Sequence, residues 1–137
     1  AIVINLNGKS VNCRYNEKNK QLIYDTRINA THAVGTAIEK LANPPQLWIN
    51  ASSATIYDHA FELQTEEQGK LGSGFSVDVC KKWERAFFGV KLDETRQVAL
   101  RMAIVLGDGG GVLEPYLGMA KAGFGGRHGL GAPCCVS

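Results

Sequence analysis

The sequence has 137 residues, a hydrophobic fraction of 45%, a charged fraction of 20% and a formal net charge of +2. This length suits one domain, and the composition is that of an ordinary globular protein. The small net charge argues against nucleic acid or an anionic membrane as a partner. No apolar run approaches the roughly 20 residues of a membrane-spanning helix.

The cysteines indicate a reducing compartment. None of the four cysteines, Cys13, Cys80, Cys134 and Cys135, stands in Cys-x-x-Cys spacing. The adjacent pair seldom forms a disulfide because the ring is strained. We therefore expect reduced thiols in a cytoplasmic protein and no metal site. A zinc site built from the adjacent pair and His128 is the alternative, although this spacing matches no familiar zinc pattern.

The first half of the chain predicts a strand followed by a helix. The apolar run at residues 1–6 predicts a strand that is buried on both faces, as in parallel sheets, and it lacks the basic leader of a signal peptide. Residues 18–42 keep the 3.6-residue apolar period of a helix. This helix ends before Pro44, because proline disfavours helical geometry in the residue before it.

The second half of the chain repeats this alternation. Residues 46–50 predict a second strand, residues 75–88 a second helix and residues 96–107 a third strand. A weaker helical segment follows near residues 113–122. The connections between strands are too long for hairpins, so the order predicts an α/β fold: a parallel sheet with right-handed crossovers, covered by helices.

Small and polar residues follow each predicted strand. Asn5, Asn7 and Gly8 follow the first strand, residues 52–55 the second and residues 107–111 the third. The carboxyl ends of parallel strands meet at one edge of a sheet, where ligands bind in such folds. We therefore expect these residues to lie along one rim that forms a binding site. Turns that cap their own backbone are the alternative.

Four separated segments resemble the extended short-chain dehydrogenase/reductases, the NAD(P)-dependent epimerase/dehydratase family. The segments are INLNGKSVNCRYNEKNKQLIYDTRINAT, ANPPQLWINASSATIY, VCKKWE and RMAIVLGDGGG. They are most similar to the SDR39U-like subfamily, also described as cell-division-inhibitor-like, over about residues 2–130. The resemblance implies a Rossmann-like fold that binds NAD(P), and an epimerase or oxidoreductase activity on a nucleotide-sugar-like or other small hydroxyl or carbonyl substrate.

One part of the family pattern has no counterpart in this sequence. Family members begin with a strand and a Gly-x-x-Gly-x-x-Gly turn that holds the cofactor pyrophosphate. We therefore expect residues 1–137 to be a single partial NAD(P)-binding domain, an internal fragment that lacks the N-terminal βαβ units, with an irregular tail from about residue 131. NAD or NADP would bind the full-length family, with weak or no binding to this chain alone. The unpaired apolar edge of the first strand predicts a homo-oligomer, through this edge or through the apolar faces of the two long helices.

The family's catalytic residues are only partly present. In the family a tyrosine acts as acid/base, a lysine four residues later lowers its pKa, and a serine, matched here by Ser53, hydrogen-bonds the reacting oxygen. Alignment on Glu84 places Ser76 at the tyrosine position and Cys80 at the lysine position. Neither residue is a suitable acid or base without strong perturbation. Tyr57 is near enough to replace the acid, and packing of its ring against the second helix is the alternative.

The resemblance and the strand ends together predict three groups of site residues. They are, as catalytic residues, Ser53 and Tyr57; as cofactor-binding residues, Asn5, Asn7, Gly8, Asn29, Ser52 and Ala103; and as substrate-binding residues, Thr55, Arg101 and Asp108. For Arg101, burial beside a carboxylate partner is an equal alternative. Because the tyrosine and lysine are missing, the alternative functions are a non-catalytic nucleotide-binding regulator and an inactive fragment that self-associates.

Overall fold

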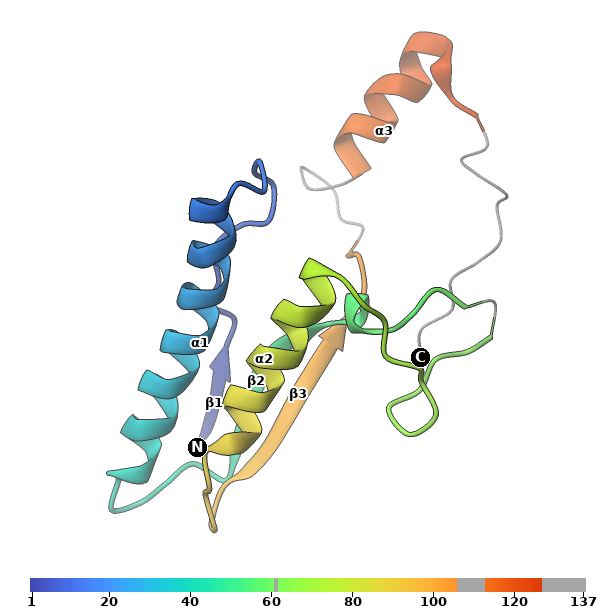
Figure 1. Ribbon diagram of the computed structural model, residues 1–137. Helices are drawn as coiled ribbons and strands as arrows, with labels where there is room; N and C mark the ends of the chain where they lie inside the picture. Colours follow the sequence, from blue (N-terminus) through green and yellow to red (C-terminus); the bar gives the residue numbers. More distant parts are fainter. Residues whose placement is uncertain (61, 106–112, 127–137) are drawn as a thin grey trace.

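A parallel sheet organises the chain. The computed structural model describes residues 1–60, 62–105 and 113–126 (Figure 1). Within them, β1 (Ile2–Asn5), β2 (Leu47–Ser53) and β3 (Arg96–Met102) form a sheet in the order β1-β2-β3, with both pairs parallel. The predicted α/β fold with a parallel sheet is confirmed.

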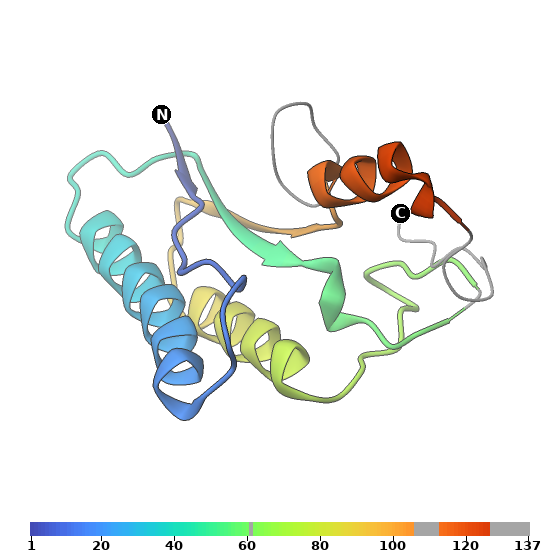
Figure 2. The ribbon, with the colours of Figure 1, turned by 90° about the horizontal axis from the view of Figure 1, so that it is seen from above.

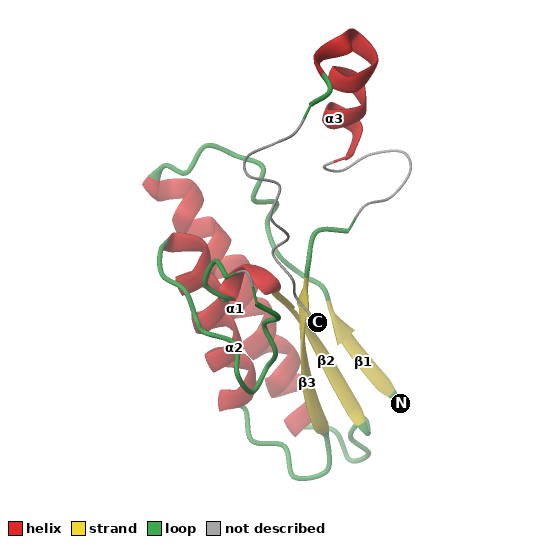
Figure 3. Ribbon diagram, turned by 90° about the vertical axis from the view of Figure 1, so that its right-hand side faces the viewer, coloured by secondary structure: helices red, strands yellow, loops and turns green. Residues whose placement is uncertain are grey.

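The two long helices lie on the same face of this sheet. α1 (Glu17–Glu39) connects β1 to β2, and α2 (Phe75–Gly89) connects β2 to β3. They lie side by side against the strands (Figures 2 and 3). The short 3-10 helix η1 (Ala54–Ile56) follows β2, and α3 (Leu113–Met119) with the π-helical turn η2 (Ala120–Phe124) stands apart from the sheet. No helix in the described part of the chain is long and apolar enough to cross a bilayer.

The ends of α1 are set by capping. The Asn16 side chain caps the first turn, since its Oδ1 accepts a hydrogen bond of 2.8 Å from the Asn19 amide. The helix ends at Glu39, before the predicted residue 42, because the Lys40 amide turns back to the Ala37 carbonyl at 3.2 Å. The chain therefore leaves the helix before it reaches the prolines.

β2 is longer than its apolar run predicts. Its last three residues pair in register with β3, up to Ser53 opposite Met102. Ser52 and Ser53 therefore belong to a strand rather than to the turn after it. β3 ends at Met102, so residues 103–105, predicted as strand, are loop, and residues 106–107 lie outside the described residues.

The apolar core lies between β2 and the helices. Trp48 and Phe87 are fully buried, with their ring centroids 4.6 Å apart, and Ile38 packs against them. Gly35 lets α1 approach this core closely, because a Cβ at that position would lie 2.7 Å from Cγ2 of Val90. This packing fixes both helices against the sheet.

The prediction that the first strand is buried on both faces is wrong. Ile2 is 62% exposed and Ile4 is 60% exposed. Two right-handed crossovers that step in the same direction across a sheet place both helices on one face. Within the described residues the opposite face is open, and Leu100 and Met102 are exposed on it as well.

Candidate functional site

A cleft of about 310 Å³ lies at the carboxyl ends of β1 and β2. Its walls come from the turn after β1, from α1, from the end of β2 with η1, and from α2. Asn7 and Ser53 both line this cleft, as a common rim requires. Gly107, the third residue expected at the rim, lies outside the described residues.

Most of the predicted residues after β1 and β2 reach this cleft. The predicted residues that line it are Asn7, Gly8, Ser52, Ser53 and Thr55. Ser76 and Cys80, which the resemblance aligns with the family's tyrosine and lysine, line it from α2. The end of β2 and the first turns of α2 therefore line the same cleft.

The other predicted residues lie elsewhere. Asn29 is exposed on α1, and Ala103 is exposed in the loop after β3; neither lines the cleft. Tyr57 and Arg101 line a second, shallow pocket beside β3. Asp108 lies outside the described residues.

A buried network of neutral polar groups lies beneath the turn after β1. Asn5, 6% exposed, donates from Nδ2 to Oδ1 of Asn50 at 2.7 Å, and its own Oδ1 accepts from the Asn7 amide at 3.1 Å. The fully buried Thr31 hydroxyl accepts from Nε1 of Trp83 at 3.0 Å and lies 3.4 Å from Oδ1 of Asn50. Asn5 thus holds the turn that lines the cleft from below.

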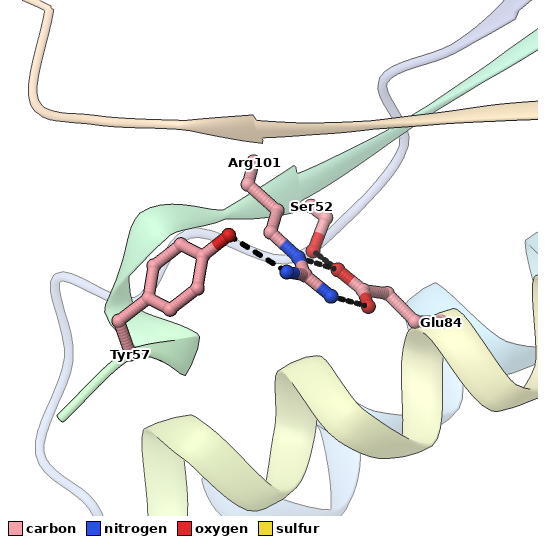
Figure 4. A network of polar contacts seen from close by, with 4 residues as sticks. All are labelled: Ser52, Tyr57, Glu84 and Arg101. Carbon is pink, nitrogen blue, oxygen red and sulfur yellow. Dashed lines mark hydrogen bonds and ion pairs between the residues drawn. The ribbon is translucent and has the colours of Figure 1, made fainter. Parts of the chain in front are cut away.

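An ion pair joins α2 to β3 on the other side of β2 (Figure 4). Glu84 accepts from Nε of Arg101 at 2.9 Å and from Nη2 of Arg101 at 2.8 Å, and the Ser52 hydroxyl donates to it at 2.6 Å. Nη1 of Arg101 donates to the Tyr57 hydroxyl at 2.8 Å. This forked pair supplies the carboxylate partner that was the alternative for Arg101.

The ion pair remains charged near neutral pH. Hydrogen bonding to Glu84 raises the pKa of Arg101. Burial works to raise the pKa of Glu84, but the hydrogen bonds from Arg101 and Ser52 outweigh it, so the pKa of this carboxyl lies below its ordinary value. The Tyr57 hydroxyl accepts from Arg101, and its ring packs against Ile56 and its neighbours.

The Ser53 hydroxyl caps the turn that follows it. Its Oγ accepts from the Thr55 amide at 3.2 Å and lies 2.8 Å from Oγ1 of Thr55. Ser53 is nevertheless only partly buried, and Thr55 is exposed. Both hydroxyls therefore remain open to the cleft while they define η1.

Cys80 is a buried thiol at the cleft wall. It is 5% exposed and packs with Ile56 and Val77. Burial, together with the negative charge of Glu84, raises the pKa of the Cys80 thiol. Within the described residues no group of three or more metal-binding side chains comes together.

Arg27 lines the cleft and was missed by the sequence analysis. Its Nη1 donates to the Lys9 carbonyl at 3.1 Å and to the Ile23 carbonyl at 3.2 Å, and its Cζ lies 5.1 Å from the centroid of the Trp83 ring. The sequence does carry a signal for it. Arg27 stands four residues after Ile23 and four before Thr31, both buried, so it falls on the inward stripe of α1.

Comparisons with known proteins agree with this geometry. No family model matches the chain. Epimerase family protein SDR39U1 of Mus musculus is 33% identical over 134 residues, which is 95% of this chain and 45% of the mouse protein. Epimerase family protein YfhF of Bacillus subtilis is 34% identical over 126 residues, 89% of this chain and 42% of that protein. The chain thus spans less than half the length of these curated relatives.

Solved structures show the same relationship. Human epimerase family protein SDR39U1 (isoform 2), solved with NADPH, superposes with a TM-score of 0.83 at 30% identity, over 96% of this chain and 45% of the human one. The nucleoside-diphosphate sugar epimerase of Corynebacterium glutamicum gives a TM-score of 0.73 at 25% identity, over 94% and 26% of the two chains. Over the segment that it spans, this chain therefore belongs to the epimerase family that includes SDR39U1 and has its Rossmann-like fold.

Proposed function

We propose that this chain forms part of an NAD(P)-dependent epimerase or oxidoreductase-like protein that acts on a nucleotide-sugar-like or other small hydroxyl or carbonyl substrate. The observation that carries this proposal is the cleft at the carboxyl ends of β1 and β2, in which Asn7, Gly8 and Ser53 come together. The human relative of the same fold was solved with NADPH. We further propose a cytoplasmic location for this chain, which the two free cysteines among its described residues, Cys13 and Cys80, support.

The cleft residues fit one half of a dinucleotide. A volume of about 310 Å³ is at the low end for a small-molecule site. Tyr15 and Phe75 offer aromatic walls for a planar base, and the hydroxyls of Ser53, Thr55 and Ser76 offer hydrogen bonds to a sugar. When bound, the nicotinamide supplies or accepts the hydride. The chain encodes no glycine-rich cradle for the pyrophosphate, so we expect weak binding by the chain alone.

In this proposal the residues in and beside the cleft have separate tasks. The Ser53 hydroxyl donates to the oxygen of the reacting carbonyl or alcohol, and Thr55 keeps that hydroxyl in place. Asn7 and Gly8 present backbone groups to the ligand, since the buried amide of Asn5 fixes their turn. Arg101 and Tyr57 lie beside β3 and support the end of β2 through Glu84.

A non-catalytic nucleotide-binding regulator is the second candidate function. It is favoured by the surroundings of Tyr57, the candidate replacement for the family's acid, and of Cys80, which aligns with the family's lysine. The Tyr57 hydroxyl accepts from Arg101 outside the cleft, and burial raises the pKa of Cys80. A protein with these features can hold a nucleotide without moving a proton on its substrate.

Titration with NADPH followed by NMR tests both candidates. We expect millimolar NADPH to shift the backbone amides of Asn7, Gly8 and Ser53, and Ser53→Ala to reduce these shifts, whereas Ser10→Ala, at an exposed serine outside the cleft, leaves them intact. Unshifted amides around the cleft would refute nucleotide binding. Micromolar affinity by calorimetry would contradict the expected weakness. Oxidation of the nicotinamide on addition of a nucleotide sugar, read from its absorbance, separates the enzyme from the regulator.

We also propose that the chain self-associates through the edge of β1. This strand pairs with β2 on one side, and its other side has no strand partner within the described residues. The exposed Ile2 and Ile4 add an apolar surface beside this free edge. Sedimentation should show that the average mass of the wild type rises with protein concentration. The average mass of Ile4→Lys should stay closer to that of the monomer. A wild-type monomer at every concentration would exclude this contact.

A further inference from the structure

Arg27 presents a guanidinium to the cleft without a carboxylate to neutralise it. Its Nη1 donates to the carbonyls of Lys9 and Ile23, whereas Nε and Nη2 have no hydrogen-bond partner within the described residues. None of the described residues that line the cleft is aspartate or glutamate. The side chain is half-buried, and burial lowers the pKa of its guanidinium. An unpaired cation in such a position is costly unless a ligand supplies the opposite charge.

The guanidinium is also held in place. Trp83 lies behind it, with the ring centroid 5.1 Å from Cζ. The Gly8 backbone lies in front, where a Cβ would come within 3.0 Å of Cζ and 3.2 Å of Nη1. The two carbonyl contacts fix one nitrogen. Because few rotamers remain open, little conformational entropy is lost when a ligand binds.

We propose that Arg27 binds an anionic group of the ligand, a phosphate or a carboxylate, and so makes the cleft selective for anionic over neutral sugars. This inference rests on the proposed function in that it assigns a ligand group to the same cleft. The two unpaired nitrogens offer N–H donors to such a group. Hydroxyls of Ser53 and Ser76 line the same cleft and suit the polar remainder of the ligand.

A purely structural role for Arg27 makes a different prediction. Its hydrogen bond to the Lys9 carbonyl links the turn after β1 to α1, and the Lys9 amide makes a second link by donating to Oγ1 of Thr26 at 3.0 Å. If these ties were its purpose, loss of the guanidinium would destabilise the ligand-free chain and weaken all ligands alike. If it serves an anion, loss of the charge removes anion binding selectively.

NMR titration of the 137-residue chain separates the two roles. The probes are inorganic pyrophosphate, glucuronate as a sugar carboxylate, NADPH and, as the neutral reference, glucose. We expect pyrophosphate or glucuronate to shift the amides of Gly8 and Cys80 more than glucose does. Arg27→Gln should lower the affinity for that anion about tenfold or more. The matched charge loss Arg85→Gln, at an exposed position of α2, should leave this affinity unchanged. The anion that binds identifies whether a phosphate or a carboxylate is the natural group.

With the simple anions, three results would overturn the proposal: no shift in the cleft with either pyrophosphate or glucuronate, an equal affinity in Arg27→Gln, or an equal loss in Arg85→Gln. Gly8→Ala serves as a second variant in case Arg27→Gln does not fold, because it keeps Arg27 but displaces its guanidinium. It should lower the affinity for the same anion. NADPH binding that is equal in wild type and Arg27→Gln leaves the proposed function intact and refutes this inference. Binding of the simple anion without binding of NADPH supports this inference and contradicts the proposed function.

Discussion

Two arginines on opposite sides of β2 show how the surroundings divide one residue type between two tasks. Arg101 meets Glu84 in a forked ion pair and also donates to Tyr57. Among the described residues, Arg27 contacts two backbone carbonyls and a tryptophan ring. The ion pair of Arg101 and Glu84 clamps α2 to β3, whereas two nitrogens of Arg27 have no acceptor among the residues that the structure describes. The presence or absence of a carboxylate thus distinguishes the clamp from the candidate site.

The largest expected effect comes from breaking the clamp. Glu84→Gln keeps the shape of the side chain but leaves Arg101, which is 25% exposed, without its counter-charge. We expect a loss of about 3 kcal/mol in the free energy of unfolding, because the remaining charge stays largely buried. Urea denaturation followed by circular dichroism measures it. By contrast, Arg27→Gln should change the stability of the ligand-free chain far less, since it removes an unneutralised cation.

A double variant and a pH series check this result. Replacing both partners, as in Glu84→Leu with Arg101→Met, should recover a large part of the loss, because no charge remains buried. The pKa of Glu84 is lower in the folded state than in the unfolded chain, where it is about 4.3. As pH falls below that value the unfolded state binds the proton first, so the wild type should lose stability. If Glu84→Gln loses stability over the same range as steeply, the ion pair is not the cause.

A smaller loss is expected in the neutral network beneath the cleft. Thr31→Val is nearly isosteric, but it removes the oxygen that accepts from the Trp83 indole. We expect a loss of about 2 kcal/mol, since the buried N–H is left without a partner. Thr36→Val, at an exposed position of the same helix, makes the same chemical change and should stay within about 0.5 kcal/mol of wild type. Equal losses in both variants would mean that helix propensity, not the buried bond, decides.

The fold was predictable where one local pattern sufficed. Apolar runs and a 3.6-residue period placed β1, α1 and α2 within a few residues of their observed ends. The extension of β2 to Ser53 was not predictable, because it depends on pairing with residues about fifty positions away in β3. The open face of β1 was missed for a similar reason. An apolar strand sequence does not show on which side its crossover helices will lie.

The site was predictable where it follows directly from strand ends. Asn7, Gly8 and Ser53 were expected at one rim, and all three line the cleft. Arg27 was missed because a single arginine in a helix is usually solvated, and only the spacing to Ile23 and Thr31 places it inward. Glu84 was used to align the chain, but its partner Arg101 is seventeen residues away, so that only the folded structure brings the pair together.

The smallest expected effect is at Tyr24, where a polar cluster bridges α1 and α2 at the surface. The Tyr24 hydroxyl donates to Oδ2 of Asp78 at 2.5 Å, and Lys82 pairs with the same oxygen at 2.8 Å. Asp78 and Lys82 are about half exposed, so Tyr24→Phe should cost less than Glu84→Gln or Thr31→Val. This comparison tests whether burial sets the strength of these contacts.

The Tyr24 cluster should instead be visible at alkaline pH. Burial and the hydrogen bond to Asp78 raise the pKa of Tyr24 to about 12. In the unfolded chain a tyrosine ionises near pH 10, so its contribution to stability is complete below about pH 10 and is lost as pH rises towards 12. The difference in ultraviolet absorbance between wild type and Tyr24→Phe, followed as a function of pH, isolates this ionisation. Asp78→Asn should lower the midpoint, because the hydrogen bond and the negative charge of Asp78 add to the effect of burial on the pKa of Tyr24. An unchanged midpoint would leave burial as the sole cause.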